Sequence, residues 1–293
     1  MVLPKRLAGV VWILVATGCY ASMAAFTKRA MADMDVFEVV FWRSVLVTVI
    51  AVIASRVVGE SLRPRHWGRL SLRSGFGLVA MVLYFWCLGE IPLGVGTTLL
   101  YTSPLFTVLL SGVVLGEARS KMTLPLALVA FVGVLFIAWP DGEVSWGSNA
   151  TLGVAAGLGS GLLAGLAYLT VRKLRETETS SGIVLFFAVF SCLGTAPLAL
   201  RNGLPDLWPH GALLLGVGVF AGLGQLAMTH AYRIEKASLV GPFSYAQIVF
   251  SFTLGAVLFG ERIDAWTVGG MALVIGAGAV LSRQANARAP KPR

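Results

Sequence analysis

The chain has 293 residues, of which 57% are hydrophobic and only 13% are charged, roughly half of the charged share that an ordinary soluble domain carries. This composition excludes a soluble globular protein, and no polar stretch is long enough to fold as a separate domain. The formal net charge of +9 would suit a partner such as nucleic acid, so the placement of the basic residues has to decide what the charge means.

Apolar windows of about 20 residues, the length of a helix that crosses the hydrocarbon core of a bilayer, recur along the whole chain. Glycine and proline inside several windows do not argue against helices, because neighbouring helices can satisfy the backbone groups that these residues free. We therefore predict an all-α membrane protein with ten transmembrane helices. The windows lie near residues 8–27, 36–55, 72–90, 93–115, 121–139, 150–171, 181–200, 211–232, 237–259 and 265–282.

The basic residues fall mainly on one side of these ten helices. That side, which includes both termini, holds 18 Lys and Arg residues, whereas the opposite side holds four. Such a bias predicts a multi-pass protein of the bacterial inner membrane with cytoplasmic termini. Because topology explains the basicity, we expect a small-molecule substrate and the lipid bilayer as partners, and no nucleic acid. The oligomeric state is left open, and a monomer is compatible with the sequence.

The cysteines predict neither a disulfide nor a metal site. Cys19, Cys87 and Cys192 lie inside predicted helices and lack the spacing of metal ligands. We expect no cofactor. Lys5 and Arg6 followed by an apolar run are similar to a signal peptide, but this segment belongs to the repeat described next, and we treat it as a retained helix.

The sequence repeats at an offset of 144 residues. The stretch LLYTSPLFTVLLSGVVLGE at 99–117 returns as FSYAQIVFSFTLGAVLFGE at 243–261, so that Tyr101 matches Tyr245 and both stretches end in Gly-Glu. Each unit contains five predicted helices, an odd number, so the second unit has to enter the membrane from the opposite face. Inverted repeats of this kind occur in secondary transporters that bind substrate near the midplane.

We therefore predict two inverted five-helix repeats around a central cavity. The expected units are a first repeat at 1–144, a second repeat at 145–283 and a basic cytoplasmic tail at 284–293.

Several residues resemble a motif of the EamA family of the drug/metabolite transporter superfamily. They are Tyr101, Pro104, Phe106 and Gly116-Glu117, the second ending Gly260-Glu261, and Arg43 in FWRSVLV. The resemblance covers the whole chain and implies ten helices around a central cavity that moves small metabolites, often outward, by alternating access. Within the family we expect similarity to the YddG-like amino-acid exporters.

Polar side chains in the middle of the spans are candidates for substrate binding, because an unsatisfied polar group is costly in hydrocarbon. Tyr101 and Ser103 lie near the centre of one predicted helix, and Tyr245 and Gln247 near the centre of its repeat mate. We expect these two faces to meet at mid-depth. Neutral or aromatic amino acids are the expected substrates, with nucleobases, drugs or a lipid-linked substrate as alternatives.

Five further residues complete the predicted site and its gates. Gln225 offers one acceptor and two donors to a zwitterionic or amide-bearing ligand, and Tyr84 and Tyr168 could supply stacking or cation–π surface. Trp86 and its repeat mate His230 could form gates at opposite ends of the pathway, with an imidazole that titrates. The alternatives are membrane-core packing for the aromatic rings and a plain interfacial position for His230.

Two charged residues need partners in so apolar a chain. Arg43 lies about two turns into the second predicted helix, and Glu90 ends the third helix on the same side. We expect a structural ion pair between them, and a clamp of Arg43 on a substrate carboxylate is the alternative.

The Gly-Glu endings and the prolines are expected to be structural. Glu117 and Glu261 should begin a connection, cap the following helix or pair with Arg119 or Arg262, because a carboxylate is disfavoured at a helix C-terminus. Pro104 and Pro242 should kink or unwind their helices near the polar side chains.

A stripe of glycines marks the sixth predicted helix, at positions 153, 157, 161 and 165. This spacing permits close helix contact, and a thin wall that slides during transport is the alternative. Paired carboxylates, a metal cluster and Ser-His-Asp spacing are all missing from the predicted spans, which argues against an enzyme. The spans also lack an embedded Asp or Glu, so facilitated, potential-driven and His230-mediated proton-coupled transport all stay open.

Overall fold

The computed structural model describes residues 5–60, 62–114, 122–138, 149–174, 177–201, 207–235, 241–262 and 264–288. Its described elements are helices: α1 (Lys5–Ala30), α2 (Val36–Val58), α3 (Trp67–Glu90), α4 (Leu93–Leu100), α5 (Ser103–Val114), α6 (Thr123–Ala138), α7 (Ala150–Leu174), α8 (Ser180–Ala199), α9 (Leu207–Ile234), the 3₁₀ helix η1 (Gly241–Tyr245), α11 (Ala246–Phe259) and α12 (Ala265–Arg288). Because α4 with α5, and η1 with α11, each form one broken helix, these elements make ten spans, and the predicted fold class is confirmed.

Seven segments in the described part of the chain are long and apolar enough to cross a membrane, and the broken α4–α5 helix is one of them. The remaining three spans contain shorter apolar helices, at Leu124–Phe136, Phe243–Phe259 and Ala265–Val280. Helix α3 begins at Trp67, five residues before the expected window. The window missed these residues because the first turns are rich in Arg and Ser, which lowers their mean hydropathy.

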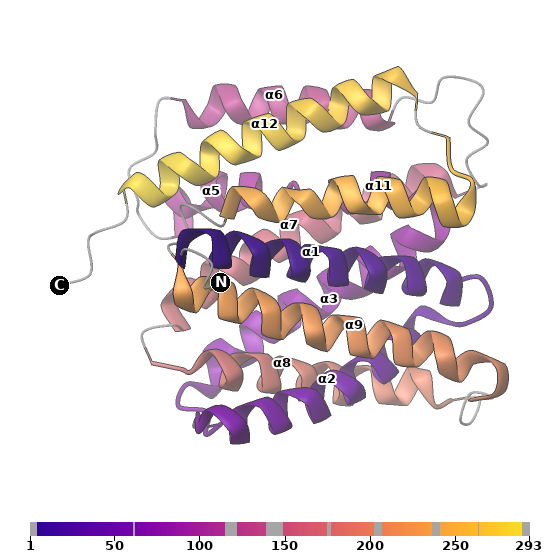
Figure 1. Cartoon of the computed structure of the whole chain (residues 1–293), viewed down its shortest axis with the longest axis vertical. Coiled ribbons are helices and arrows are strands. Elements are labelled where there is room, and N and C mark those ends of the chain that lie inside the picture. Colours follow the sequence, from indigo (N-terminus) through magenta and orange to yellow (C-terminus); the bar gives the residue numbers. More distant parts are fainter. Residues whose placement is uncertain are drawn as a thin grey trace.

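The helices lie side by side across the view in Figure 1, with α6 and α12 at one end of the long axis and α2 and α8 at the other. The contacts follow a pseudo-two-fold arrangement. Helix α1 packs on α9, and its repeat mate α7 packs on α3, while α2 packs on its own mate α8 and α6 on its own mate α12. Helix α1 begins and α12 ends on the same side of the view.

The second helix of each repeat starts with the same device. Asp35 caps α2 by accepting a hydrogen bond of 2.8 Å from the Phe37 N–H, and Glu38 accepts one from the Asp35 N–H. Thr179, which is 144 residues further on, caps α8 by accepting from the Gly182 N–H at 3.1 Å. Such caps satisfy N–H groups that have no partner inside the helix.

Both broken helices are interrupted at the same repeat position. Helix α4 ends at Leu100 and Tyr101 follows with φ −73° and ψ 3°, whereas η1 ends at its mate Tyr245 and α11 follows. Pro104 is the second residue of α5, a place where its missing N–H has no helical partner to lose. Pro242 lies within η1. The breaks therefore place irregular backbone at corresponding depths of the two repeats.

The glycine stripe of α7 lies against the first of these breaks. A Cβ at Gly157 would lie 2.7 Å from Leu99 Cδ1, and a Cβ at Gly165 would lie 3.0 Å from the Ser103 carbonyl oxygen. At Gly161 a Cβ would collide with Thr102 Oγ1 and lie 2.8 Å from the Leu99 carbonyl oxygen. The absence of side chains thus lets α7 approach the backbone of α4 and α5 directly.

Candidate substrate site between the repeats

The two breaks bring polar side chains from both repeats together. Tyr101 Oη donates a hydrogen bond of 2.9 Å to Gln247 Oε1, and the Tyr101 and Tyr245 rings lie 5.4 Å apart between centroids. Gln247 and Tyr245 are 4% and 3% exposed. Because Tyr101 and Tyr245 are repeat mates in contact, this midplane cluster of Tyr101, Tyr245 and Gln247 lies on the pseudo-two-fold axis.

A chain of hydroxyl groups lies next to the midplane cluster. Thr97 Oγ1 is 3.1 Å from Tyr84 Oη and 3.1 Å from Ser251 Oγ, so it joins α3, α4 and α11. Ser103 is buried at the start of α5, where its carbonyl oxygen accepts a hydrogen bond of 2.8 Å from Thr107. Each of these groups is held by another polar group, as low-dielectric surroundings require.

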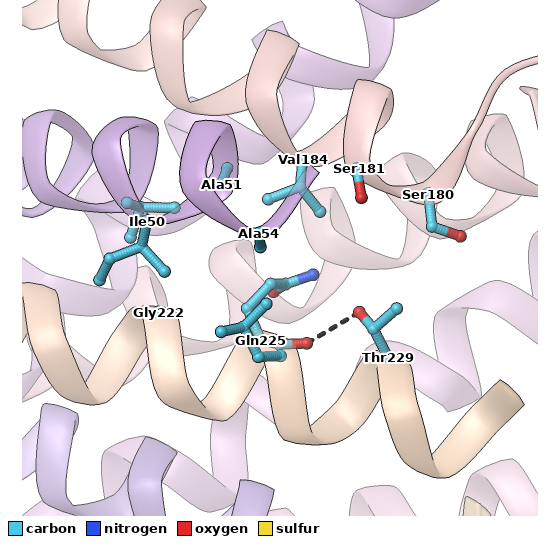
Figure 2. A pocket seen from close by; sticks show the side chains of 11 residues that line it. Ile50, Ala51, Ala54, Ser180, Ser181, Val184, Gly222, Gln225 and Thr229 are labelled. Atoms are coloured by element: carbon cyan, nitrogen blue, oxygen red, sulfur yellow. Dashed lines mark hydrogen bonds between the residues drawn. The ribbon is translucent and has the colours of Figure 1, made fainter. Parts of the chain in front are cut away.

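Gln225 lies apart from the midplane cluster. Its Oε1 accepts a hydrogen bond of 2.9 Å from Tyr20 Oη on α1. Figure 2 shows its side chain extending from α9 into a pocket that α2 and α8 close on the other side. No described residue accepts from its amide nitrogen. The pocket, with about 380 Å³ of empty space including open solvent at its mouth, is lined by Val47, Ile50, Ala51, Ala54, Ser180, Ser181, Val184, Gly222, Gln225, Leu226 and Thr229.

The remaining aromatic candidates do not join one site. Tyr168 on α7 is 53% exposed. Trp86 is partly buried between two hydrophobic clusters near the end of α3. His230 is exposed near the end of α9, where its ring lies 4.8 Å from that of Trp12 in an edge-on contact. A gating role for Trp86 and His230 therefore stays a prediction.

The expected ion pair between Arg43 and Glu90 is wrong. The ion pairs among the described residues join Lys28 to Glu261 and Arg29 to Asp33, and His66 Nδ1 lies 3.6 Å from Glu178 Oε1; neither Arg43 nor Glu90 takes part in these contacts. Instead, the Arg43 guanidinium lies over the ring of Phe187 on α8, with 5.8 Å between Cζ and the ring centroid. The expectation failed because equal depth in the membrane does not place two side chains on facing sides of their helices.

Glu261 is structural, but its partners differ from those expected. Its carboxylate accepts from the Leu93 N–H at 3.0 and 2.9 Å and lies 3.2 Å from Lys28 Nζ, so it caps α4 of the other repeat. Neither Arg262 nor the following helix is its partner. The carboxylate thus sits at a helix N-terminus, where the dipole favours it. Its repeat mate Glu117 and the candidate partner Arg119 lie outside the described residues.

Lys28 completes a polar seal at this end of the bundle. Its ammonium donates to the carbonyl oxygens of Ile91 at 2.7 Å and Leu88 at 3.1 Å as well as pairing with Glu261. We call the contact among Lys28, Glu261 and Leu93 the Lys28–Glu261 seal. It joins the last turn of α1, the connection between α3 and α4, and the end of α11, on the membrane face opposite the start of α1.

Sequence reasoning missed Tyr20, Ser251 and Lys28 as parts of these networks. Position 97, by contrast, lies one helical turn before Tyr101, and this spacing predicts that the two side chains share a polar face. Tyr20 and Ser251 are polar residues among apolar neighbours in their helices. A search for isolated polar residues at mid-span would have identified both. The partners that they bond cannot be read from one helix alone.

The inverted repeats, the two helices broken at equivalent positions and the polar residues gathered between them are typical of membrane transporters. The EamA-like transporter family model matches twice, at residues 7–139 and 151–283. The chain therefore belongs to the EamA-like transporter family, within the drug/metabolite transporter superfamily, and is a multi-pass membrane protein that moves small metabolites.

Curated relatives and a solved structure match along most of their length. The pseudopaline exporter of Pseudomonas aeruginosa is 31% identical over 284 residues, which cover 97% of this chain and 99% of the exporter. The riboflavin transporter of Vibrio cholerae is 27% identical over 265 residues, 87% of this chain and 86% of that protein. A crystal structure at 17% identity superposes with a TM-score of 0.65 over 98% of this chain and 99% of the other, which shows the shared fold.

Proposed function

We propose that this protein exports small amino-acid-like metabolites by alternating access, with the midplane cluster as the point of substrate contact. The single observation that carries the proposal is the meeting of Tyr101 and Tyr245 at the two helix breaks, joined to Gln247. A site on the pseudo-two-fold axis is reachable from either membrane face when the two repeats move relative to each other.

The chemistry of the midplane cluster suits an amino acid. The Gln247 amide and the Tyr101 and Tyr245 hydroxyl groups offer both donors and acceptors to a zwitterion, and the tyrosine rings offer a face to an ammonium group or an aromatic side chain. The named relatives carry pseudopaline in one case and riboflavin in another. Because the family accommodates such different solutes, the choice among amino acids, nucleobases and drugs rests on this cluster.

Two features at opposite ends of the bundle support a direction of opening. The Lys28–Glu261 seal joins helices on the face opposite the start of α1. The pocket beside Gln225 is lined by the C-terminal halves of α2 and α9 and by the first turns of α8, toward the face where α1 begins. With the termini in the cytoplasm, as the basic residues favour, the pocket faces the cytoplasm, and repeats at 1–144 and 145–283 would rock to release substrate outside.

Flux into proteoliposomes tests the proposal. Purified protein is reconstituted and the uptake of labelled phenylalanine, tryptophan, threonine and methionine is measured with and without a pH gradient. We expect saturable flux of at least one of them that Gln247→Ala reduces tenfold or more, since the variant loses hydrogen bonds in a buried site. Thr253→Ala, which removes an exposed hydroxyl from the same helix, should leave the flux unchanged. Flux no greater than that of empty vesicles would overturn the amino-acid assignment.

A further inference from the structure

Two arginines converge inside the bundle, away from the midplane cluster. Measured along the helix axis, Arg43 lies about 10 Å from the first residue of α2, and Arg73 lies about 9 Å from the first residue of α3. Both guanidinium groups lie over the same ring, that of Phe187 on α8, at 5.8 Å for Arg43 and 4.1 Å for Arg73. Because they share one ring, the two Cζ atoms are at most about 10 Å apart.

These guanidinium groups have buried donors without partners. The Nε and Nη1 atoms of both Arg43 and Arg73 are buried and make no hydrogen bond. Among the described carboxylates, Glu261 pairs with Lys28, Asp33 pairs with Arg29 and Glu178 lies beside His66 instead. A buried donor that has lost its water and gained no acceptor is costly, and a buried charge more so. Repulsion between the two arginines adds to that cost. The arrangement therefore calls for an anionic partner.

The neighbouring residues make room for the arginine pair. A Cβ at Gly77 on α3 would lie 2.9 Å from Phe187 Cε2 and 3.1 Å from Arg73 Nη1, so a larger residue here would force the ring or the guanidinium to shift. Phe187 is also the repeat mate of Arg43, which puts the pair close to the pseudo-two-fold axis. The arginine pair and the midplane cluster therefore both lie near this axis, at different points of it.

The pocket beside Gln225 leads toward this site. Val47 lies one helical turn after Arg43 on α2, and Val184 lies one turn before Phe187 on α8; both line the pocket. A solute that enters the pocket therefore approaches the two arginines.

We infer that Arg43 and Arg73 bind carboxylate groups of the transported substrate, and that the substrate class is an amino-acid-like metabolite with two carboxylates. This inference rests on the proposed function, because it takes the solute in the pocket to be cargo. Each guanidinium presents a planar fork of donors that matches a carboxylate. Two forks on one ring suit a compact dicarboxylate, whereas a neutral amino acid would leave one arginine unpaired.

Binding of glutarate to the purified protein tests the inference without any transport. Glutarate is a dicarboxylate, and glutaramide is a neutral molecule of nearly the same shape. Titration calorimetry and thermal unfolding in detergent should show that glutarate binds and raises the unfolding temperature, and that glutaramide does neither. Arg43→Gln and Arg73→Gln should each weaken glutarate binding about ten- to hundredfold, as loss of a charge-assisted hydrogen-bonded pair predicts. Arg56→Gln, at an exposed position on α2, should bind like the wild type.

Several outcomes would overturn the inference. Equal binding of glutarate and glutaramide, or glutarate binding that survives both substitutions, would place the ligand elsewhere. If either Gln variant fails to fold, Arg43→Lys and Arg73→Lys replace it; they should bind more weakly than the wild type, and unchanged affinity would contradict the role of the fork. Loss of glutarate binding in nanodiscs when phosphatidylglycerol is added would assign the site to a lipid headgroup instead.

The result separates this inference from the proposed function. Saturable amino-acid flux without glutarate binding would leave the transporter assignment in place and refute the dicarboxylate site. Glutarate binding that needs both arginines, in a protein that carries neither labelled glutarate nor any labelled amino acid in proteoliposomes, would support the anion site and refute export.

Discussion

The hydrogen bond from Tyr101 to Gln247 is the smallest unit on which the proposed pathway depends. Removing the hydroxyl in Tyr101→Phe keeps the ring contact with Tyr245 but leaves Gln247 Oε1 buried without its donor. We expect the free energy of unfolding to fall by about 1–3 kcal/mol and the KM for transport to rise. Unfolding in a denaturant titration and flux kinetics would measure the two effects.

A control variant separates this effect from a general loss of polarity. Thr253→Val removes a hydroxyl from the exposed side of α11, and it should change stability by less than about 0.5 kcal/mol. Equal losses in the Tyr101 and Thr253 variants would contradict the special role of the midplane cluster.

Glu90 provides a second prediction at the scale of the residue. Since it forms no ion pair with Arg43, Glu90→Gln should change the free energy of unfolding by no more than about 0.5 kcal/mol. The double variant that exchanges the charges, Glu90→Arg with Arg43→Glu, should be no more stable than the single variants. Membrane insertion and thermal unfolding of both variants would check this, and a rescued double variant would restore the ion pair that the sequence suggested.

Single residues show how far sequence reasoning reached. Tyr101, Tyr245 and Gln247 could be found because polar groups at mid-span are rare and because the repeat aligns two of them. The partners of Arg43 and Glu261 could not, because a partner depends on helix rotation and on contacts between repeats. Arg73 was counted among the basic residues of the membrane face, since the apolar window placed the start of its helix too late.

At the scale of the element, the contact between α7 and the α4–α5 break carries the next prediction. Gly161→Ala would force Thr102 or the Leu99 carbonyl to move, and overpacking of this kind costs about 1–3 kcal/mol. Gly159→Ala, whose Cβ would meet only Leu83 Cδ1 at 3.4 Å, should instead gain up to about 1 kcal/mol from helix propensity. The unfolding free energies of the two variants in detergent would decide.

The same pair of variants separates packing from movement. A Gly161→Ala protein that is as stable as the Gly159→Ala protein yet carries no substrate would favour the sliding wall over a static contact. Sequence reasoning predicted ten spans because hydropathy is a property of each segment. It did not place the breaks at Tyr101 and Tyr245, because Pro104 and Pro242 each lie a few residues away from the break in their helix.

At the scale of the whole molecule, the Lys28–Glu261 seal holds the two repeats together at one face. Glu261→Gln removes the charge that pairs with Lys28 and weakens the cap on α4. We expect the seal to open more often and Cys87, which is fully buried one residue before Leu88, to react faster with a maleimide. The measurement is the labelling rate with Cys19 and Cys192 replaced by serine.

Arg29→Gln is the matched control, because Arg29 pairs with Asp33 on the exposed side of the same helix end. Its Cys87 labelling rate should equal that of the parent, and a rate as fast as that of Glu261→Gln would show that any charge loss at this face loosens the bundle. The seal itself could not be predicted from one sequence, since it joins residues near opposite ends of the chain. The sequence repeat, by contrast, predicted the symmetry that relates the contact of α1 with α9 to the contact of α7 with α3.

We expect the two repeats to open the midplane cluster to one face while they close it to the other. Pulsed electron paramagnetic resonance measures this directly, with spin labels at Ala32 and Arg262 across the sealed face and at Arg56 and Arg233 beside the pocket, all exposed positions. In Glu261→Gln, the Ala32–Arg262 distance should become longer and the Arg56–Arg233 distance shorter. A longer distance at the sealed face with no change beside the pocket would contradict it.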